Sequence, residues 1–190
     1  FSVFTDTVNY HITDSEDYKK LISLYENRTD KDKPFYLFNV TMQNHLPYTE
    51  VYEDKKTYSE NHDANSYLQR QKESDEALKT LIEYFEEYNE KVIILFLGDH
   101  QPNLGISEII NDKENKYKVP YLIWANYDIE TKDYGDTSAN FLQGILIEVA
   151  NLPKDEYTNY IIELRKEIPV ITANYYIGNN GKKYALNDST

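Results

Sequence analysis

The stretch Val92-Ile93-Ile94-Leu95-Phe96-Leu97-Gly98-Asp99-His100-Gln101-Pro102 carries the strongest structural signal in this chain. Six consecutive apolar residues, rich in β-branched types, predict a buried strand that stops at the glycine. Asp99 and His100 follow at once. Ligands of open α/β sheets bind outside the carboxyl ends of the strands, so both side chains are expected at a position where such sheets bind ligands. A local alternative stays open, in which the pair forms a turn and the histidine only bonds nearby backbone.

Working outward from this strand, the remaining periodic segments predict an α/β fold. Apolar runs predict strands at 34–42 and 119–124, and helical spacing of apolar residues predicts helices at 13–27, 66–88, 137–149 and 154–166. The order strand, helix, strand suggests a right-handed parallel crossover. The turn Asn179-Asn180-Gly181 between two tyrosine-containing arms predicts a hairpin over about 173–186. We expect residues 1–190 to form a single α/β unit, a mainly parallel sheet flanked by helices with a small C-terminal β-hairpin.

The composition excludes several classes of function. The chain has 190 residues with 33 acidic and 20 basic side chains, which gives a formal net charge of −13. Such a chain would repel a phosphate backbone, so no nucleic-acid partner is expected. Cysteine is absent, which excludes disulfides, thiolate catalysis and Cys-zinc sites. The sequence also lacks the GxSxG, GxxxxGK[ST] and HExxH patterns, so serine-hydrolase, P-loop and zincin mechanisms have no support.

Asp99 and His100 are the first candidates for a functional site. A carboxylate and an imidazole are both good ligands for a borderline divalent metal. A catalytic metal usually takes at least three protein ligands, and no second acidic cluster at another strand end supplies the rest. Either the missing ligands lie outside this chain, or no metal binds.

His45 is the second candidate, because it follows the predicted strand 34–42 by three residues. If the two strands are parallel neighbours, His45 and His100 open onto the same edge, where an imidazole could bind a phosphoryl or sulfuryl oxygen or transfer a proton. A loop histidine bonded to backbone is the plain alternative. His11 and His62 have weaker claims to a site, and Arg70 and Arg165 are expected to form surface ion pairs of little energetic value.

Taken together, these motifs resemble a known family. The segment Phe35–His45, the helix around Lys72-Glu73-Ser74-Asp75-Glu76-Ala77-Leu78 and the motif Gly98-Asp99-His100-Gln101-Pro102 look like the lipoteichoic acid synthase-like sulfatases, a branch of the alkaline phosphatase superfamily. Residues 119–124, 137–142 and 164–175 fit later segments of the family in the same order. Each motif is moderately specific, and their joint order covers nearly the whole chain.

The resemblance implies a membrane-anchored enzyme on the extracytoplasmic face of a bacterial cell membrane, of Gram-positive type, which could also be released. Such enzymes hold a divalent metal, typically Mn²⁺, beside a threonine or serine nucleophile. They transfer phosphoglycerol from a lipid donor to a polymer, or hydrolyse related phosphate or sulfate esters of the cell envelope. Asp99 and His100 match two metal ligands of the family, and His45 matches a histidine that contacts the substrate phosphate.

The chain departs from the family pattern in one respect. The family's first metal-binding glutamate, its nucleophile and its phosphate-contacting arginine belong to an earlier part of the fold than this chain covers. We therefore expect residues 1–190 to be the C-terminal part of a catalytic domain, to hold half of the metal site, and to be inactive in isolation. The membrane anchor would likewise lie in the missing N-terminal segment of the parent protein. The alternative is a non-catalytic domain that binds a glycan or a protein.

Overall fold

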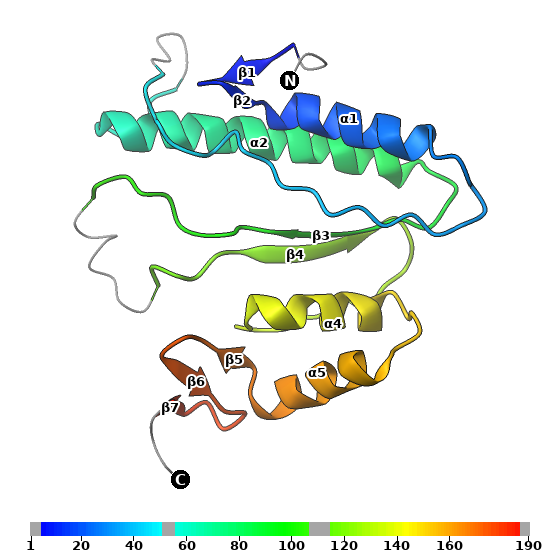
Figure 1. The fold of residues 1–190 in the computed structure, drawn as a ribbon. Helices are drawn as coiled ribbons and strands as arrows, with labels where there is room; N and C mark the ends of the chain where they lie inside the picture. The colour runs from blue at the N-terminus through cyan, green and yellow to red at the C-terminus, as the bar shows by residue number, and fades with distance from the viewer. Residues whose placement is uncertain (1–4, 51–55, 107–114, 187–190) are drawn as a thin grey trace. The chain divides into compact units, whose positions relative to one another are not determined.

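The computed structural model describes residues 5–50, 56–106 and 115–186 (Figure 1). Its elements occur in the order β1 (Thr7–Val8), β2 (His11–Ile12), α1 (Asp14–Glu26), α2 (His62–Glu86), β3 (Ile93–Leu97), β4 (Tyr121–Ala125), α4 (Ala139–Val149), α5 (Glu156–Glu167), β5 (Val170–Ile171), β6 (Tyr175–Ile177) and β7 (Lys183–Ala185). The chain divides into two compact units, one of Phe1–Glu90 with Leu97–Tyr121 and one of Lys91–Phe96 with Leu122–Thr190.

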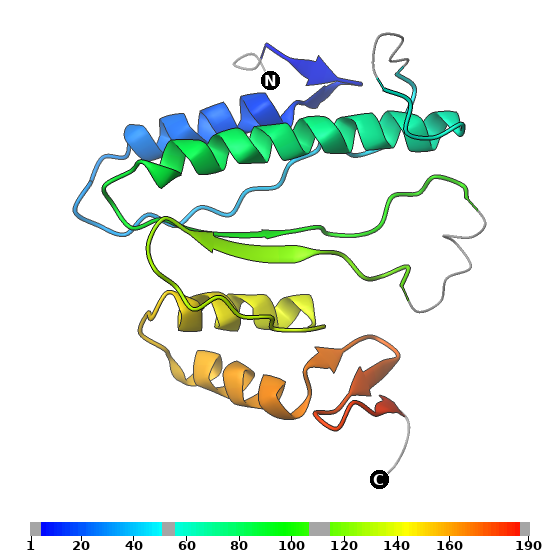
Figure 2. The ribbon, with the colours of Figure 1, turned by 180° about the vertical axis from the view of Figure 1, so that it is seen from behind.

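Helices α1 and α2 form the body of the first unit and lie side by side (Figure 2). The Thr13 hydroxyl accepts a hydrogen bond from the Glu16 amide at 3.3 Å, which caps α1. The Asn61 side chain caps α2 through the Ala64 amide at 2.9 Å, so this helix begins four residues before its predicted start at 66. The helices predicted at 13–27 and 66–88 are confirmed.

The interface of these two helices is aromatic. Tyr25 of α1 and Phe85 of α2 are buried, and their rings meet edge to face with centroids 5.3 Å apart. Ala77 and Leu81 are also buried, at the spacing of four residues that places side chains on one face of a helix. The predicted apolar stripe of α2 is therefore the face that packs.

The segment 34–42 is not a strand in the structure, so this prediction is wrong. Its side chains keep the alternation of a strand, with Tyr36, Phe38 and Val40 exposed by 80%, 76% and 60%. A strand needs a hydrogen-bonded neighbour, and within the described ranges no segment pairs with this one. The predicted parallel crossover from 34–42 to the next strand is therefore not seen.

Strands β3 and β4 confirm the predicted strands at 92–97 and 119–124, and they pair with each other. The prediction that the first of them is buried is wrong, because β3 is half-buried and ends on an exposed leucine. The Gly98 amide donates to the Pro120 carbonyl and the Asn126 amide to the Val92 carbonyl, each at 3.1 Å. These two bonds join opposite ends of the pair, which makes it antiparallel. The pairings β1–β2, β5–β6 and β6–β7 are antiparallel as well, so the prediction of a mainly parallel sheet is wrong for the described strands.

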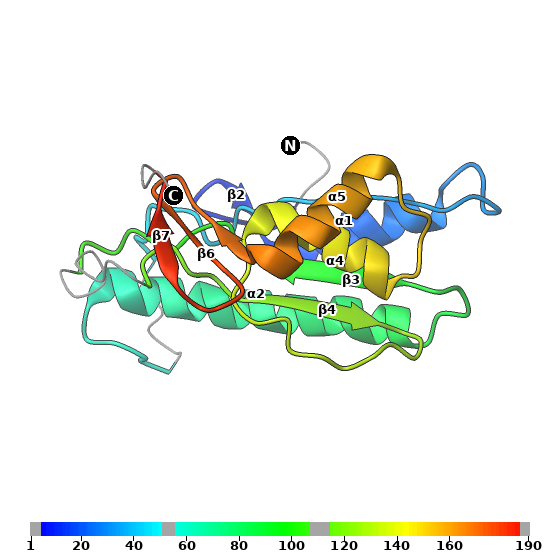
Figure 3. The same ribbon diagram turned by 90° about the horizontal axis from the view of Figure 1, so that it is seen from below.

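The second unit packs α4 against α5 and carries the three-stranded sheet β5-β6-β7 (Figure 3). Gly144 of α4 faces Ile162 of α5, where an added Cβ would lie 3.3 Å from the isoleucine side chain, so the two helices approach closely. The helices predicted at 137–149 and 154–166 and the hairpin at 173–186 are confirmed. The expected surface ion pair of Arg165 is not found with any described residue, and its guanidinium donates instead to the Tyr134 carbonyl at 2.9 Å.

A further hairpin, β1–β2, was not expected from the sequence. Val8 pairs with His11, and the two residues between them, Asn9 and Tyr10, have φ angles of 45° and 68°. Two positive φ angles are typical of a type I′ turn, in which asparagine is favoured and an aromatic residue is not. The Tyr10 side chain is 93% exposed, so its backbone strain is not offset by packing.

Replacing Tyr10 by glycine is expected to leave the protein as stable or to stabilise it by up to about 1 kcal/mol, because glycine adopts this conformation without strain. Urea unfolding of the Tyr10→Gly and Tyr10→Ala variants measures the effect, and the alanine variant should show no gain because it keeps the strain. A loss of more than about 1 kcal/mol in the glycine variant would contradict a strained turn.

No described helix combines the length and the apolar character that crossing a membrane requires.

Candidate functional site

Asp99 and His100 follow β3 directly, where the sequence predicts them. Both side chains are exposed, and His100 Nε2 lies 3.4 Å from Asp99 Oδ2. His100 Nδ1 is 2.9 Å from the carbonyl oxygen of Gln101. A carbonyl only accepts, so Nδ1 carries the proton and the neutral ring keeps its lone pair on Nε2. Metal-bound histidines commonly donate their second ring nitrogen to a carbonyl in this way.

The spacing of these two donor atoms suits one ion. If each atom lay about 2.1 Å from a metal, a separation of 3.4 Å would correspond to an angle of about 110° at the ion. Gly98 helps to place the pair, because a Cβ there would lie 3.1 Å from the Val119 Cβ. Among the residues that the structure describes, no group of three or more His, Cys, Asp or Glu side chains could hold a metal.

His45 lies on the loop that follows residues 34–42, and the loop is fixed by Arg70 of α2. Arg70 is fully buried, although its charged head would be expected in water. Its guanidinium donates to the carbonyl oxygens of Gln43 at 3.1 Å, of His45 at 2.7 Å and of Pro47, and it pairs with the Glu50 carboxylate. The expectation of a surface ion pair at Arg70 is therefore wrong. Arg70, which α2 carries, thus donates hydrogen bonds to several backbone carbonyls of this loop.

Glu50 completes this anchor. Burial tends to raise the pKa of its carboxyl, but hydrogen bonds from Arg70 and Ser66 outweigh burial and lower the pKa. A lowered pKa means that Glu50 stabilises the fold as an anion at neutral pH, and that this stabilisation disappears as the pH falls through the lowered value. The loop that carries His45 is thus held most firmly at neutral pH.

The imidazole of His45 is exposed and has the same tautomer as His100. Its Nδ1 lies 2.9 Å from the carbonyl oxygen of Leu46, so Nδ1 carries a proton. Nε2 makes no hydrogen bond within the described ranges of the chain, and it is therefore the atom available to a substrate. In the neutral ring Nε2 accepts a proton, and in the charged ring it donates to an anionic oxygen.

Sequence reasoning gave His11 little weight, yet His11 lies against His45. The two rings meet edge to face with centroids 5.4 Å apart, and His11 Nε2 is 3.3 Å from the Leu46 carbonyl oxygen. The contact joins residues 34 positions apart and arises from the β1–β2 hairpin, which no periodicity in the sequence signals. His62, by contrast, is an exposed residue at the start of α2 that pairs with Asp63 at 3.2 Å.

Two tyrosines pack beside the loop that carries His45. The Tyr67 ring packs on Tyr48 at 5.6 Å between centroids, and the Tyr48 hydroxyl donates to the Asn44 carbonyl at 3.0 Å. Burial raises the pKa of Tyr67, and the negative charge of Asp99 raises it further. No described hydrogen bond or ion pair joins His45 to Asp99 or His100.

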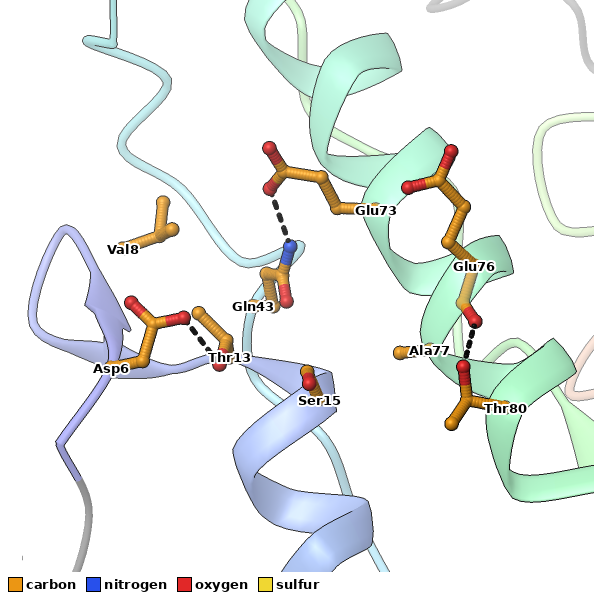
Figure 4. Close-up of a pocket in the computed structure, with 9 residues that line it drawn as sticks. All are labelled: Asp6, Val8, Thr13, Ser15, Gln43, Glu73, Glu76, Ala77 and Thr80. Atoms are coloured by element: carbon orange, nitrogen blue, oxygen red, sulfur yellow. Dashed lines mark hydrogen bonds between the residues drawn. The ribbon is translucent and has the colours of Figure 1, made fainter. Parts of the chain in front are cut away.

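A separate hollow of about 360 Å³ lies between the β1–β2 hairpin, the start of α1 and the middle of α2 (Figure 4). Its lining includes the carboxylates of Asp6, Glu73 and Glu76, and Gln43 donates to Glu73 across it at 3.0 Å. Three carboxylates would repel a phosphate or sulfate group. None of the candidate residues His45, Asp99 and His100 lines this hollow, which is therefore a different place from the predicted site.

Comparison with known proteins identifies the fold and the family. The solved structure of the Streptococcus pyogenes phosphoglycerol transferase GacH, in complex with sn-glycerol-1-phosphate, matches 88% of this chain with a TM-score of 0.74 and 24% sequence identity. A Rhizobium meliloti (strain 1021) protein named for cyclic beta-1,2-glucan modification is 27% identical over 177 residues, or 81% of this chain. The chain spans 45% of the GacH chain and 28% of the R. meliloti protein.

The family model named Sulfatase matches residues 5–151, which include β1 to α4 and all three candidate residues. The likeness to GacH confirms the predicted α/β fold class, that of a sulfatase or alkaline phosphatase. The chain belongs to the sulfatase family, in the alkaline phosphatase superfamily.

Proposed function

We propose that this chain supplies part of the active site of a metal-dependent sulfatase-family enzyme, with Asp99 and His100 as metal ligands and His45 as the residue that contacts the substrate's phosphoryl or sulfuryl group. The observation that carries the proposal is the pair of donor atoms after β3. Asp99 Oδ2 and His100 Nε2 lie 3.4 Å apart, and the Nδ1 proton of His100 is already committed to a carbonyl. The bond from His100 Nδ1 to Gln101 also fits a local turn, so the titration with Mn²⁺ decides between the two interpretations.

Each candidate residue then has its own role in the proposed reaction. Asp99 brings a negative charge and His100 a neutral nitrogen to one point in space. A divalent ion held there would stabilise negative charge on the attacked group and activate the nucleophile. His45 donates from Nε2 to a non-bridging oxygen of the ester when its ring is charged, because its Nδ1 proton is held by Leu46. Arg70 keeps the His45 backbone in place without touching the substrate.

The substrate that fits these residues is a phosphate or sulfate ester of a cell-envelope lipid or polymer. GacH was solved with sn-glycerol-1-phosphate, and the R. meliloti relative is named for glucan modification, so both relatives point to envelope carbohydrate or phosphoglycerol chemistry. We place the enzyme on the extracytoplasmic face of a bacterial membrane, with Mn²⁺ as its metal. Whether the ester is transferred or hydrolysed depends on groups that approach Asp99, His100 and His45 from elsewhere.

We further propose that the nucleophile and the remaining metal ligands come from another segment of a longer polypeptide, and that residues 1–190 form the C-terminal part of its catalytic domain. The support is twofold. The described residues hold no cluster of three metal-binding side chains, and the relatives extend well beyond the matched region. The 190-residue chain alone would then be inactive.

Calorimetric titration with Mn²⁺ tests this proposal. We expect the 190-residue chain to bind Mn²⁺ only at millimolar concentration, and the full-length protein to bind it at micromolar concentration through additional ligands. The Asp99→Ala variant of the full-length protein should lose the micromolar binding. Micromolar binding by the 190-residue chain would contradict a half-site, and unchanged binding by full-length Asp99→Ala would contradict the assignment of Asp99.

A further inference from the structure

We infer that His11 is a positioning residue for His45, and that it fixes the ring so that Nε2 of His45 faces the substrate's anionic oxygens. This inference rests on the proposed function for the role of His45. The geometry itself belongs to the β1–β2 hairpin and the loop of residues 43–49, which lie in one compact unit.

The first observation is a shared acceptor. His45 Nδ1 lies 2.9 Å and His11 Nε2 lies 3.3 Å from the same carbonyl oxygen, that of Leu46. A carbonyl oxygen has two lone pairs and can accept both bonds, and each imidazole must then carry its proton on the nitrogen that faces Leu46. The same backbone carbonyl thus holds each histidine in one tautomer.

The second observation is the ring contact. His11 meets His45 edge to face, with centroids 5.4 Å apart and an angle of 67° between the planes. His11 is half-buried while His45 is exposed, so the inner ring restricts the outer one. Without His11, the His45 side chain would keep its own bond to Leu46 but would lose the surface that stops the ring from turning to another rotamer.

The third observation is that the hairpin is itself fastened to the loop. The Asn9 side-chain amide donates to the Pro47 carbonyl at 2.8 Å and to the Thr49 hydroxyl at 3.0 Å. Val8 and His11 are paired across the hairpin, so the anchoring of Asn9 also sets the position of His11. The loop is therefore held by Arg70 and by the hairpin, and His11 of the hairpin contacts the His45 ring.

Two substitutions separate the hydrogen bond from the ring contact. His11→Gln keeps an N–H donor near the position of Nε2 but removes the ring, whereas His11→Phe keeps an aromatic edge but removes the donor. His62→Gln makes the same chemical change at an exposed histidine outside the site and serves as the matched control. Each variant is made in the full-length protein, together with His45→Ala.

The readouts are the ring ¹⁵N spectrum of His45 and the affinity for sn-glycerol-1-phosphate. We expect His11→Gln, which lacks the ring, to reduce the fraction of His45 with its Nδ1 proton held on Leu46 and to weaken binding about tenfold, because the imidazole can then turn to other rotamers. His11→Phe, which keeps an aromatic edge against His45, should retain most of the affinity, and His62→Gln should match the unmodified protein. Loss of stability alone would leave the His45 spectrum of the folded fraction unchanged.

The outcomes distinguish this inference from the proposed function. If His45→Ala weakens binding but neither His11 variant alters the His45 spectrum or the affinity, the positioning role of His11 is refuted while the role of His45 stands. If the unmodified protein does not bind glycerol phosphate, the proposed substrate contact fails. In that case the His45 spectrum of His11→Gln still decides whether the His11 ring orients His45, and an unaltered spectrum overturns the inference.

Discussion

Replacing His100 by alanine in the full-length protein is expected to reduce turnover of a phosphate ester at least about 1,000-fold in the presence of Mn²⁺. The substitution removes one of the two ligands after β3 and leaves Asp99 as a single carboxylate, which binds a divalent ion poorly. Asp99→Asn should have a similar effect, since it removes the ligand's charge while keeping its size. The measurement is kcat with a chromogenic phosphodiester, with bound metal determined on the same samples.

His62→Ala is the matched control for this experiment. His62 is also exposed and also lies beside a carboxylate, Asp63, but at the start of a helix and away from the candidate site. Its turnover should equal that of the unmodified protein. Full turnover in His100→Ala would refute the metal site. If the unmodified protein shows no turnover and instead binds a glycan whether or not Asp99 is replaced, the chain belongs to a binding domain.

Replacing Arg70 by methionine is expected to destabilise the protein by about 3–5 kcal/mol. The side chain is fully buried, and its removal takes the guanidinium donor from the carbonyls of Gln43 and His45 and the positive charge from Glu50. Ser66 still donates to Glu50, and Asn9 still donates to the Pro47 carbonyl. Methionine fills much of the volume, so the loss reports the hydrogen bonds and the charge more than a cavity. Urea unfolding measures the change, and the affinity for glycerol phosphate should fall in parallel because the His45 loop is released.

Lys72→Met provides the control on the same helix. Lys72 pairs with Glu76 at 3.0 Å on an exposed face, and such surface pairs contribute about 0.5 kcal/mol or less. A large loss of stability in Lys72→Met would show that α2 tolerates no substitution of a basic residue, and the loss in Arg70→Met would then not report the buried guanidinium. A loss below about 1 kcal/mol in Arg70→Met would show that water can replace the buried guanidinium, and would contradict its role as the anchor of the loop.

A local signal for the site can be recognised in hindsight. His45 and His100 each precede a residue that is followed by proline, in His45-Leu46-Pro47 and His100-Gln101-Pro102. The residue before a proline is kept out of the helical region, which restricts the backbone after each histidine. In both places the histidine Nδ1 bonds to the carbonyl of that restricted residue, and Nε2 is turned outward. The sequence contains this repeated pattern of histidine, any residue and proline. Only the structure shows that the carbonyl of the middle residue faces the histidine Nδ1.

The sequence by itself determined the helices and strands that depend on residues close together in the chain. Apolar spacing and a capping residue specify α1 and α2, and a run of apolar residues ending in Gly98 specifies β3 and places Asp99 and His100 after it. These features depend on residues a few positions apart, so they can be predicted from spacing. The motif order likewise pointed to the family that the comparison identifies.

Only the tertiary structure decided which distant groups meet. Arg70 is buried because residues 43–50 bring carbonyls and a carboxylate to it, and His11 reaches His45 because a hairpin with two positive φ angles turns it there. The segment 34–42 is apolar enough for a strand but lacks a paired neighbour, and β3 pairs with β4 in the antiparallel sense. Hydrogen bonds between segments twenty or more residues apart depend on how the whole chain closes, and no local spacing encodes that.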